Sequence, residues 1–244
     1  MCRHLAYLGQ PVALHELLFG APHSLCRQAS APVHQTSGDS NPDGWGAGWY
    51  VDGDVEPHQY RTTTPIWDDA VFADSSRVIE SGALLAAARL ASEGATIHES
   101  GNAPFRSGRW LFSLNGYVKN FHRGVGDRLR SRLSASRRAA LVGDSDSEVL
   151  FALVLDRLDL GRSATAALCS VIEEVNAVSS GRLNMLLTDG HHVVGTRLGN
   201  SLFVREATVA SEPLDDAPGW REVPDGSLVE VAAAHAVAPT ITAL

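Results

Sequence analysis

A cysteine stands second in this chain, directly after the initiator methionine. Because its side chain is small, we expect an aminopeptidase to remove Met1 and to leave Cys2 with a free α-amine. An unperturbed α-amino group has a pKa of about 7.7 to 8.0, so near neutral pH it can take the proton of the thiol. Amine-activated nucleophiles of this kind are a known route to covalent catalysis. The alternative is that position 2 tolerates any small residue and the cysteine has no chemical role.

Three later stretches could bind or polarise a substrate at such a nucleophile. Arg89 ends an apolar run, where its guanidinium could hold a carboxylate through two parallel hydrogen bonds. Asn115 and Gly116 follow another apolar run, and an amide side chain with a glycine N–H can form an oxyanion hole. Asp146 stands where a helix is expected to begin, and its carboxylate could accept hydrogen bonds from a substrate ammonium group.

Each of these positions also has an ordinary structural explanation. Asn-Gly is the commonest turn dipeptide, so Asn115 and Gly116 could simply close a hairpin. Arg89 could form a surface ion pair, and Asp146 could complement the dipole of the helix that it begins. No single one of them decides the function.

The elements that must position these residues begin with a strand. The side chains of residues 4–8 alternate in type, which predicts a strand close to the start of the chain. Such a strand would hold Cys2 in place, whereas a frayed terminus could not position a nucleophile. Residues 44–51 alternate glycine with aromatic or small residues, which predicts a strand whose glycine face meets another backbone or a ligand. Residues 84–89 and 110–114 are further apolar strands.

The rest of the chain is predicted to alternate between helical and strand-rich parts. We expect a short helix over residues 12–18, a long loop over 22–43 and a helix from Asp68 or Asp69 towards Ile79. The middle of the chain predicts helices, with a capping box from Ser145 to Glu148 and an N-cap at Ser163; they cover residues 121–133, 147–158 and 164–178. Strands return over residues 184–188, 193–197, 202–205, 208–211 and 227–231. This order predicts two sheets with helices outside, in one domain over residues 2–244.

Composition excludes several classes of function. The net charge is -8 and the pI about 5.6, so we expect no nucleic-acid partner. The most apolar run, residues 149–155, is too short to span a membrane, and no signal peptide precedes the first strand, which favours the cytoplasm. The three cysteines show neither CxxC nor zinc spacing, so we expect a reducing compartment, no metal and no cofactor. Nothing in the sequence indicates an oligomeric state.

Several motifs together resemble those of the class II glutamine amidotransferases, which are N-terminal-nucleophile hydrolases. Besides Arg89, they are Met1-Cys2-Arg3-His4, Asp43 to Tyr50, Asn102-Ala103-Pro104-Phe105, Phe112 to Gly116 and Ser145 to Glu148. The resemblance implies an α+β fold, a four-layer α/β/β/α sandwich. It also implies a small γ-glutamyl substrate whose amide Cys2 attacks. Asn115 and the Gly116 N–H would stabilise the oxyanion, Arg89 would bind the glutamyl α-carboxylate and Asp146 its α-ammonium.

Departures from the family pattern narrow the expected substrate. Ammonia-transferring members usually follow the arginine with Trp-Ala-Thr-His-Gly, whereas this chain has Leu90-Ala91-Ser92-Glu93-Gly94, and we expect no synthase domain within 244 residues. This form of the motif looks most like that of the family members that hydrolyse γ-glutamyl-hercynylcysteine sulfoxide to hercynylcysteine sulfoxide and glutamate in ergothioneine biosynthesis. Because that substrate carries a trimethylammonium group, Trp45, Trp67 or another aromatic near the long loop is expected to contact it.

Three other functions remain open at this point. One is a glutaminase subunit that supplies ammonia to a separate synthase, and another is a γ-glutamyl peptidase of glutathione-like thiols. A third is a binding module without catalysis, which would be expected to keep Met1.

Overall fold

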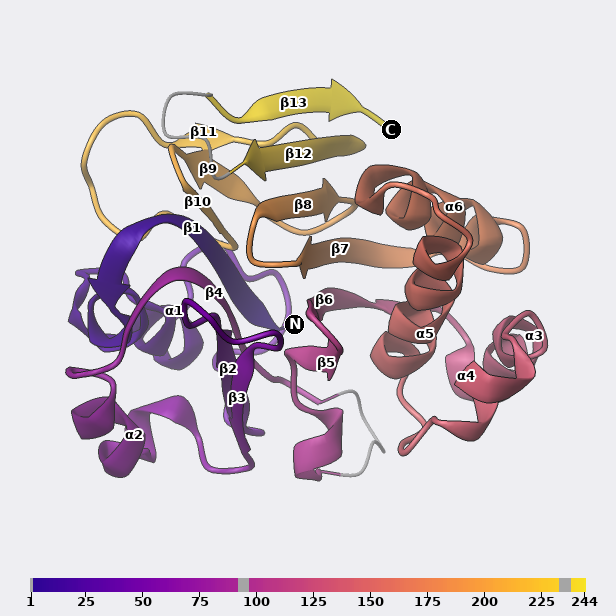
Figure 1. Cartoon of the computed structure of the whole chain (residues 1–244), viewed down its shortest axis with the longest axis horizontal. Coiled ribbons are helices and arrows are strands. Elements are labelled where there is room, and N and C mark those ends of the chain that lie inside the picture. The colour runs from indigo at the N-terminus through magenta and orange to yellow at the C-terminus, as the bar shows by residue number, and fades with distance from the viewer. Residues whose placement is uncertain (1, 92–96, 233–237) are drawn as a thin grey trace.

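Two antiparallel sheets lie face to face, each covered on its outer side by helices (Figure 1). The protein is described here by a computed structural model that covers residues 2–91, 97–232 and 238–244. Within these residues, one sheet has seven strands and the other six. The predicted α+β fold with α/β/β/α layers is confirmed.

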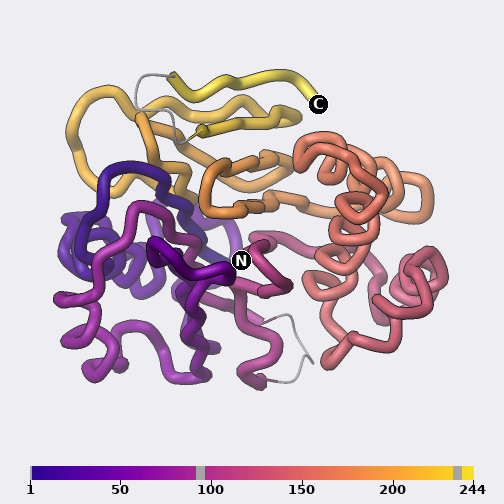
Figure 2. Tube along the Cα trace, viewed as in Figure 1, coloured from indigo at the N-terminus to yellow at the C-terminus, as the bar shows by residue number. Residues whose placement is uncertain are grey.

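The first sheet places the start of the chain in its middle. Its strands, from edge to edge, are β11 (Arg221–Glu222), β9 (Phe203–Arg205), β10 (Thr208–Ala210), β1 (Arg3–Ala13), β4 (Glu80–Ala88), β2 (Trp45–Trp49) and β3 (His58–Thr62). Strand β1 pairs with β10 on one side and with β4 on the other. The trace in Figure 2 accordingly starts in the middle of the molecule and ends at its rim. Hydrogen bonding on both sides therefore holds the residues that follow Cys2.

The second sheet carries the Asn-Gly pair within a strand. Its strands are, in order, β13 (Thr240–Ala243), β12 (Ser227–Ala232), β8 (His192–Arg197), β7 (Gly181–Thr188), β6 (Trp110–Val118) and β5 (Phe105–Ser107). Strand β6 pairs with β7 along its length, and Asn115 lies opposite Asn184. Asn115 and Gly116 therefore do not form a hairpin turn.

Short helices cover the first sheet and longer ones the second. The first sheet is covered by a π-helix (η1, Glu16–Gly20), α1 (Leu25–Ser30) and α2 (Ala70–Ser75). The second is covered by α5 (Asp146–Asp159) and α6 (Ala164–Asn176), with α3 (Val125–Arg130) and α4 (Ala135–Ala139) beyond them (Figure 1). Three 3-10 turns complete the described elements: η2 (Ile66–Asp68), η3 (Glu99–Gly101) and η4 (Phe121–Arg123).

Alternation along the strands divides the apolar core into three layers. In β1, Leu5 packs towards the helices of the first sheet, whereas Ala6 and Leu8 pack between the two sheets. In β6, Phe112 packs towards α5 and α6. Each fully buried leucine or phenylalanine contributes about 1.5–3 kcal/mol through apolar burial, so the two sheets and their helices are held in register by all three layers.

The glycine strand β2 behaves as its alternation predicts. Trp45 and Ala47 pack under the helices, and the intervening Gly46 and Gly48 face the other sheet. A Cβ at Gly46 would lie 2.6 Å from the carbonyl oxygen of Ala103, which no side chain could tolerate. The predicted close approach of another backbone is therefore confirmed.

Several predicted boundaries are wrong for identifiable reasons. Residues 121–133 are broken at Gly124, whose φ of 93° separates η4 from α3. Strand β1 runs on to Ala13, so the predicted helix over residues 12–18 begins later, as η1. The expected loop over residues 22–43 contains α1, which Ser24 caps by accepting a hydrogen bond from the backbone of Arg27. The helix expected to run to Ile79 is shorter, because α2 ends at Ser75.

The two well-capped helices are where the sequence places them. Ser145 accepts a hydrogen bond from the N–H of Glu148, as the capping box requires. The Glu148 carboxylate, however, accepts from the N–H groups of Val142 and Gly143 instead of that of Ser145. Ser163 caps α6. None of the helices within the described ranges is long and apolar enough to cross a lipid bilayer.

Candidate active site

Cys2 lies at the start of the central strand β1 and is half-buried. Its thiol points to the carbonyl oxygen of Leu90 at 3.8 Å. Its own carbonyl oxygen accepts a hydrogen bond of 2.9 Å from Nε of Arg3. The backbone of His4, two residues after Cys2, is held as well, because its N–H donates to Oγ of Ser211. Cys2 is therefore fixed on its backbone, while its sulfur faces the end of strand β4.

Arg89 directly follows β4, beside Cys2. Its backbone N–H donates to Gly44, and its guanidinium approaches Oδ1 of Asn102 at 3.5 Å. The guanidinium also lies over Gly101, where a Cβ would come within 2.9 Å of it. Asn102 is itself held by a hydrogen bond to the carbonyl oxygen of Thr62. These contacts orient a cation that can receive a carboxylate.

Asn115 and Gly116 lie in β6, on the strand that faces β1 across the molecule. Asn115 is fully buried, and its Nδ2 donates to Oγ of Ser211 at 3.3 Å. Gly116 is packed so closely that a Cβ would lie 1.8 Å from the carbonyl oxygen of Arg182. Position 116 therefore requires glycine for packing alone. Ser211 links this pair to the nucleophile strand, because the same oxygen accepts from the His4 N–H.

Asp146 is the first residue of α5 and joins that helix to the end of β6. One carboxylate oxygen accepts from the Val118 N–H at 2.8 Å, and the other accepts from the N–H and hydroxyl of Ser147. Burial raises the pKa of Asp146, and these hydrogen bonds oppose the rise. By accessible surface Asp146 is half-buried, and it lines the neighbouring cavity, where a carboxylate can accept further hydrogen bonds.

A cavity of about 850 Å³ brings most of these residues together. Cys2, Arg89, Gly116 and Asp146 all line it, and Asn115 lies directly behind its wall between Leu114 and Gly116. The volume suits a substrate of moderate size. Met1 and the Ser92-Glu93-Gly94 part of the arginine motif lie outside the described residues. The catalytic and binding roles of the five residues stay predictions.

Further residues of the cavity were not singled out by sequence reasoning. They include Tyr117, Lys119, Asn120, His122, Arg123 and Asp144. Lys119 is the one lysine in the chain, which was a signal that could have drawn attention to it. Lys119 and Arg123 are exposed and line the cavity, and in the part of the chain that the structure describes neither forms a salt bridge.

Neither of the two tryptophans that were expected to contact the substrate lines the cavity. Trp45 is fully buried under the helices of the first sheet, and its indole N–H donates to Asp69, so the prediction that it contacts a substrate is wrong. Trp67 does not line the cavity either. Aromatic side chains that do line it are Tyr117, Phe105 and Phe121, and Tyr117 is the exposed one.

Buried polar side chains surround the nucleophile strand. His4 is fully buried between the sheets, and its Nδ1 lies 2.7 Å from Oγ of Ser113. Burial, with the positive charge of Arg3, lowers the pKa of His4 to about 3, so the imidazole is neutral. No group of three or more metal-ligating side chains occurs within residues 2–91, 97–232 and 238–244.

Comparisons with known proteins show the family to which the chain belongs. Residues 14–206 match the family model of the class II glutamine amidotransferases. The chain is 37% identical over 241 residues to the γ-glutamyl-hercynylcysteine sulfoxide hydrolase of Mycolicibacterium smegmatis, covering 97% of this chain and 98% of that protein. It is also 37% identical to the hydrolase of the same name from Mycobacterium tuberculosis, over 95% of this chain and 93% of that one.

Solved structures show the same fold at lower identity. A class II glutamine aminotransferase domain protein from Silicibacter pomeroyi superposes with a TM-score of 0.69 at 23% identity, covering 99% of both chains. The glutamine phosphoribosylpyrophosphate amidotransferase of B. subtilis superposes with a TM-score of 0.67 at 15% identity, over all of this chain and 49% of that one. On the family match, the extent of the identity and the shared architecture, the chain belongs to the class II glutamine amidotransferases.

Proposed function

We propose that the protein hydrolyses a γ-glutamyl amide through an N-terminal cysteine thioester, with γ-glutamyl-hercynylcysteine sulfoxide as its substrate. The observation that supports this most directly is the shared cavity, which Cys2 lines together with Arg89, Gly116 and Asp146. The 37% identity to hydrolases of that substrate, over nearly the whole of both chains, supports the choice of leaving group.

The proposed reaction runs in two stages. After removal of Met1, the α-amine of Cys2 takes the thiol proton, and the thiolate adds to the γ-carbonyl carbon. The Asn115 amide and the Gly116 N–H stabilise the oxyanion. The protonated α-amine of Cys2 then returns its proton to the leaving amine, which departs. Water then attacks the thioester and releases glutamate. Arg89 and Asp146 hold the α-carboxylate and α-ammonium of the glutamyl group through both stages.

Charges in the cavity favour a leaving group larger than ammonia. The amine that leaves from the proposed substrate belongs to a cysteine derivative, so it carries an α-carboxylate. Lys119 and Arg123 supply positive charge for that carboxylate, and the face of Tyr117 suits the trimethylammonium group. Glutamine, whose leaving group is ammonia, would use none of these three side chains.

A comparison of substrates tests the proposal. Purified protein is incubated with γ-glutamyl-hercynylcysteine sulfoxide, glutathione or glutamine, and the release of glutamate and of ammonia is measured. We expect kcat/KM to be highest for the first substrate and Cys2→Ala to abolish its hydrolysis while retaining binding. Preferred release of ammonia from glutamine would instead identify a glutaminase subunit.

Intact-mass measurement tests the nucleophile separately. We expect the purified chain to lack Met1 and to gain one adduct on Cys2 from an electrophilic glutamine analogue. A chain that keeps Met1 and stays unlabelled would contradict the mechanism and favour a non-catalytic binding module. The compartment proposed is the cytoplasm, which the three unpaired cysteines support.

A further inference from the structure

Behind the cavity wall, a line of hydrogen bonds runs from a cation to the amide of Asn115. Nη1 of Arg182, on β7, donates to Oδ1 of Asn200 at 3.2 Å. Nδ2 of Asn200 in turn donates to the backbone oxygen of Asn115 at 2.9 Å and to its Oδ1 at 3.2 Å. Nδ2 of Asn115 then donates to Oγ of Ser211. Asn115 and Asn200 are both buried.

Arg182 determines which group donates and which accepts in each of these hydrogen bonds. A guanidinium can only donate hydrogen bonds, so Asn200 must turn its oxygen towards Arg182 and its NH₂ group towards Asn115. Asn115 must then turn its oxygen towards Asn200. The Asn115 NH₂ group is left on the opposite side, next to Ser211 and the strand that carries Cys2.

This direction matters for an oxyanion hole. The amide NH₂ group has two protons, of which one goes to Ser211 and the other remains for a substrate oxygen. If the amide were flipped, Oδ1 would face the developing negative charge and repel it. Asn200 resists such a flip of the Asn115 amide because its own backbone is held in place. The side chain of Asn184 accepts from the N–H of Asn200 and donates to its carbonyl oxygen.

We infer that Arg182 and Asn200 are positioning residues that fix the Asn115 amide with its NH₂ group towards the reacting carbonyl. The inference rests on the proposed oxyanion role of Asn115 but not on the identity of the leaving group. Both residues act through Asn115 and touch no substrate. The loop before β2 joins the same line, since Nη1 of Arg182 also donates to Oγ1 of Thr36 at 3.0 Å.

Two substitutions of Asn200 separate polarity from packing. Asn200→Asp keeps the shape and the contact with Arg182, but a carboxylate accepts where the amide donated, so it would draw the Asn115 NH₂ group away from the cavity. Asn200→Ala removes the donor, together with the oxygen that accepts from Arg182, and puts no new acceptor in its place. We expect kcat to fall by roughly 10² to 10³ in Asn200→Asp, the loss of one oxyanion donor, and about tenfold in Asn200→Ala, the loss of one hydrogen bond. KM should change little in either.

The order of the two variants is the decisive result. If packing alone mattered, the isosteric Asn200→Asp would be the milder change, and that order would overturn the inference. Asn176→Asp, at the exposed end of α6, controls for the added charge. Alkylation of Cys2 by iodoacetamide forms no oxyanion, so its rate should match wild type in all variants that fold.

Arg182 gives an independent pair of variants should Asn200→Asp fail to fold. Lysine also only donates, so Arg182→Lys should keep most of kcat, whereas Arg182→Met should lose at least about tenfold. Equal losses in the two would overturn the inference.

A measurement without turnover separates this inference from the proposed function. In protein labelled with ¹⁵N-asparagine, the side-chain amide signal of Asn115 should shift in Asn200→Asp and stay in Arg182→Lys. An unmoved signal in Asn200→Asp would overturn the inference, whatever substrate the enzyme turns over.

Discussion

Arg3 and Glu212 form an ion pair that is almost completely removed from water. Nη1 of Arg3 lies 2.7 Å from the Glu212 carboxylate, and the two side chains are 0% and 5% exposed. The same guanidinium donates through Nε to the carbonyl oxygen of Cys2, and the same carboxylate accepts from the N–H groups of Val33 and His34. One buried pair thus joins the nucleophile to the loop that precedes β2.

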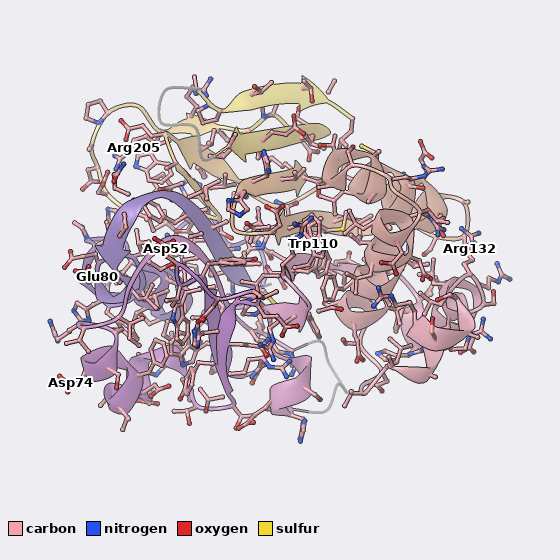
Figure 3. The ribbon with its side chains drawn as sticks, in the orientation of Figure 1. Asp52, Asp74, Glu80, Trp110, Arg132 and Arg205 are labelled. Carbon is pink, nitrogen blue, oxygen red and sulfur yellow. The ribbon has the colours of Figure 1, made fainter. Side chains whose placement is uncertain are left out.

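We predict that Glu212→Gln lowers the free energy of unfolding by roughly 3 to 5 kcal/mol, because it leaves the buried Arg3 charge uncompensated. The double variant Arg3→Met/Glu212→Gln should lose less than the sum of the single variants. Urea unfolding measures this cycle. The pair of Asp215 with Arg205 on β9 is the control (Arg205 is labelled in Figure 3), and Asp215→Asn should cost clearly less, since that pair is more exposed. Simple additivity at Arg3 and Glu212 would contradict the prediction.

His4 should make stability depend on pH. Its pKa of about 3 in the folded protein lies below the ordinary 6.5, so the unfolded chain binds more protons between these values. Stability is therefore complete above about pH 6.5 and falls as the pH is lowered towards 3, with a loss of about 2 kcal/mol between pH 7.5 and pH 5. His4→Gln should remove this part of the pH dependence in urea unfolding. The exposed His58→Gln is the control and should keep it.

The sequence contains much of this fold because alternation and capping are local signals. Strand β1, the glycine strand β2 and helices α5 and α6 follow from spacing and from Ser145 and Ser163. Helix α1 was missed because a six-residue helix has too few turns to show a period. Gly124 was read as part of a helix because a single glycine inside a periodic apolar pattern does not show whether it adopts a positive φ.

The candidate site was predicted as far as single motifs reach. Cys2, Arg89 and Asp146, which line one cavity, were singled out because their types are chemically distinctive and each stands beside a recognisable element. Asn200 was missed because its partner Asn115 is 85 residues away, and the two meet only because β7 pairs with β6 on one side and with β8, which Asn200 follows, on the other. Trp45 was offered as one possible substrate contact because alternation does not say which face of β2 is covered.

Gly116→Ala should damage both stability and activity. The added methyl group would overlap the carbonyl oxygen of Arg182 at 1.8 Å, so β6 and β7 would have to separate locally. We expect a loss of about 1 to 3 kcal/mol in thermal or urea unfolding, and a larger relative loss in kcat. Gly20→Ala is the matched control, because its nearest neighbours lie at an ordinary 3.4 Å. Similar effects of the two variants would show that the close approach at Gly116 is unimportant.

Asp146→Asn should weaken substrate binding more than it changes the fold. The variant loses the charge proposed to face the glutamyl ammonium, which we expect to raise KM at least about 30-fold, equivalent to 2 kcal/mol or more. Because burial raises the pKa of Asp146, kcat/KM of wild type should fall on acidification at a pH above 3.8. The exposed Asp144→Asn, in the same cavity wall, is the control. If KM is unchanged in Asp146→Asn, the predicted binding role is wrong, and Asp146 serves only to accept hydrogen bonds from Val118 and Ser147.

Lys119 and Arg123 should discriminate between leaving groups. If they attract the carboxylate of the departing cysteine derivative, Lys119→Glu/Arg123→Glu should raise KM for γ-glutamyl-hercynylcysteine sulfoxide several-fold, at about 0.5 kcal/mol for each exposed charge. KM for glutamine, which lacks that carboxylate, should stay within a factor of about two. The effect should weaken with added salt, because both side chains are exposed and salt screens such charges. Arg221→Glu, which makes the same change outside the cavity, is the control. An equal rise in KM for both substrates would place the two cations at the glutamyl end instead of the leaving-group end.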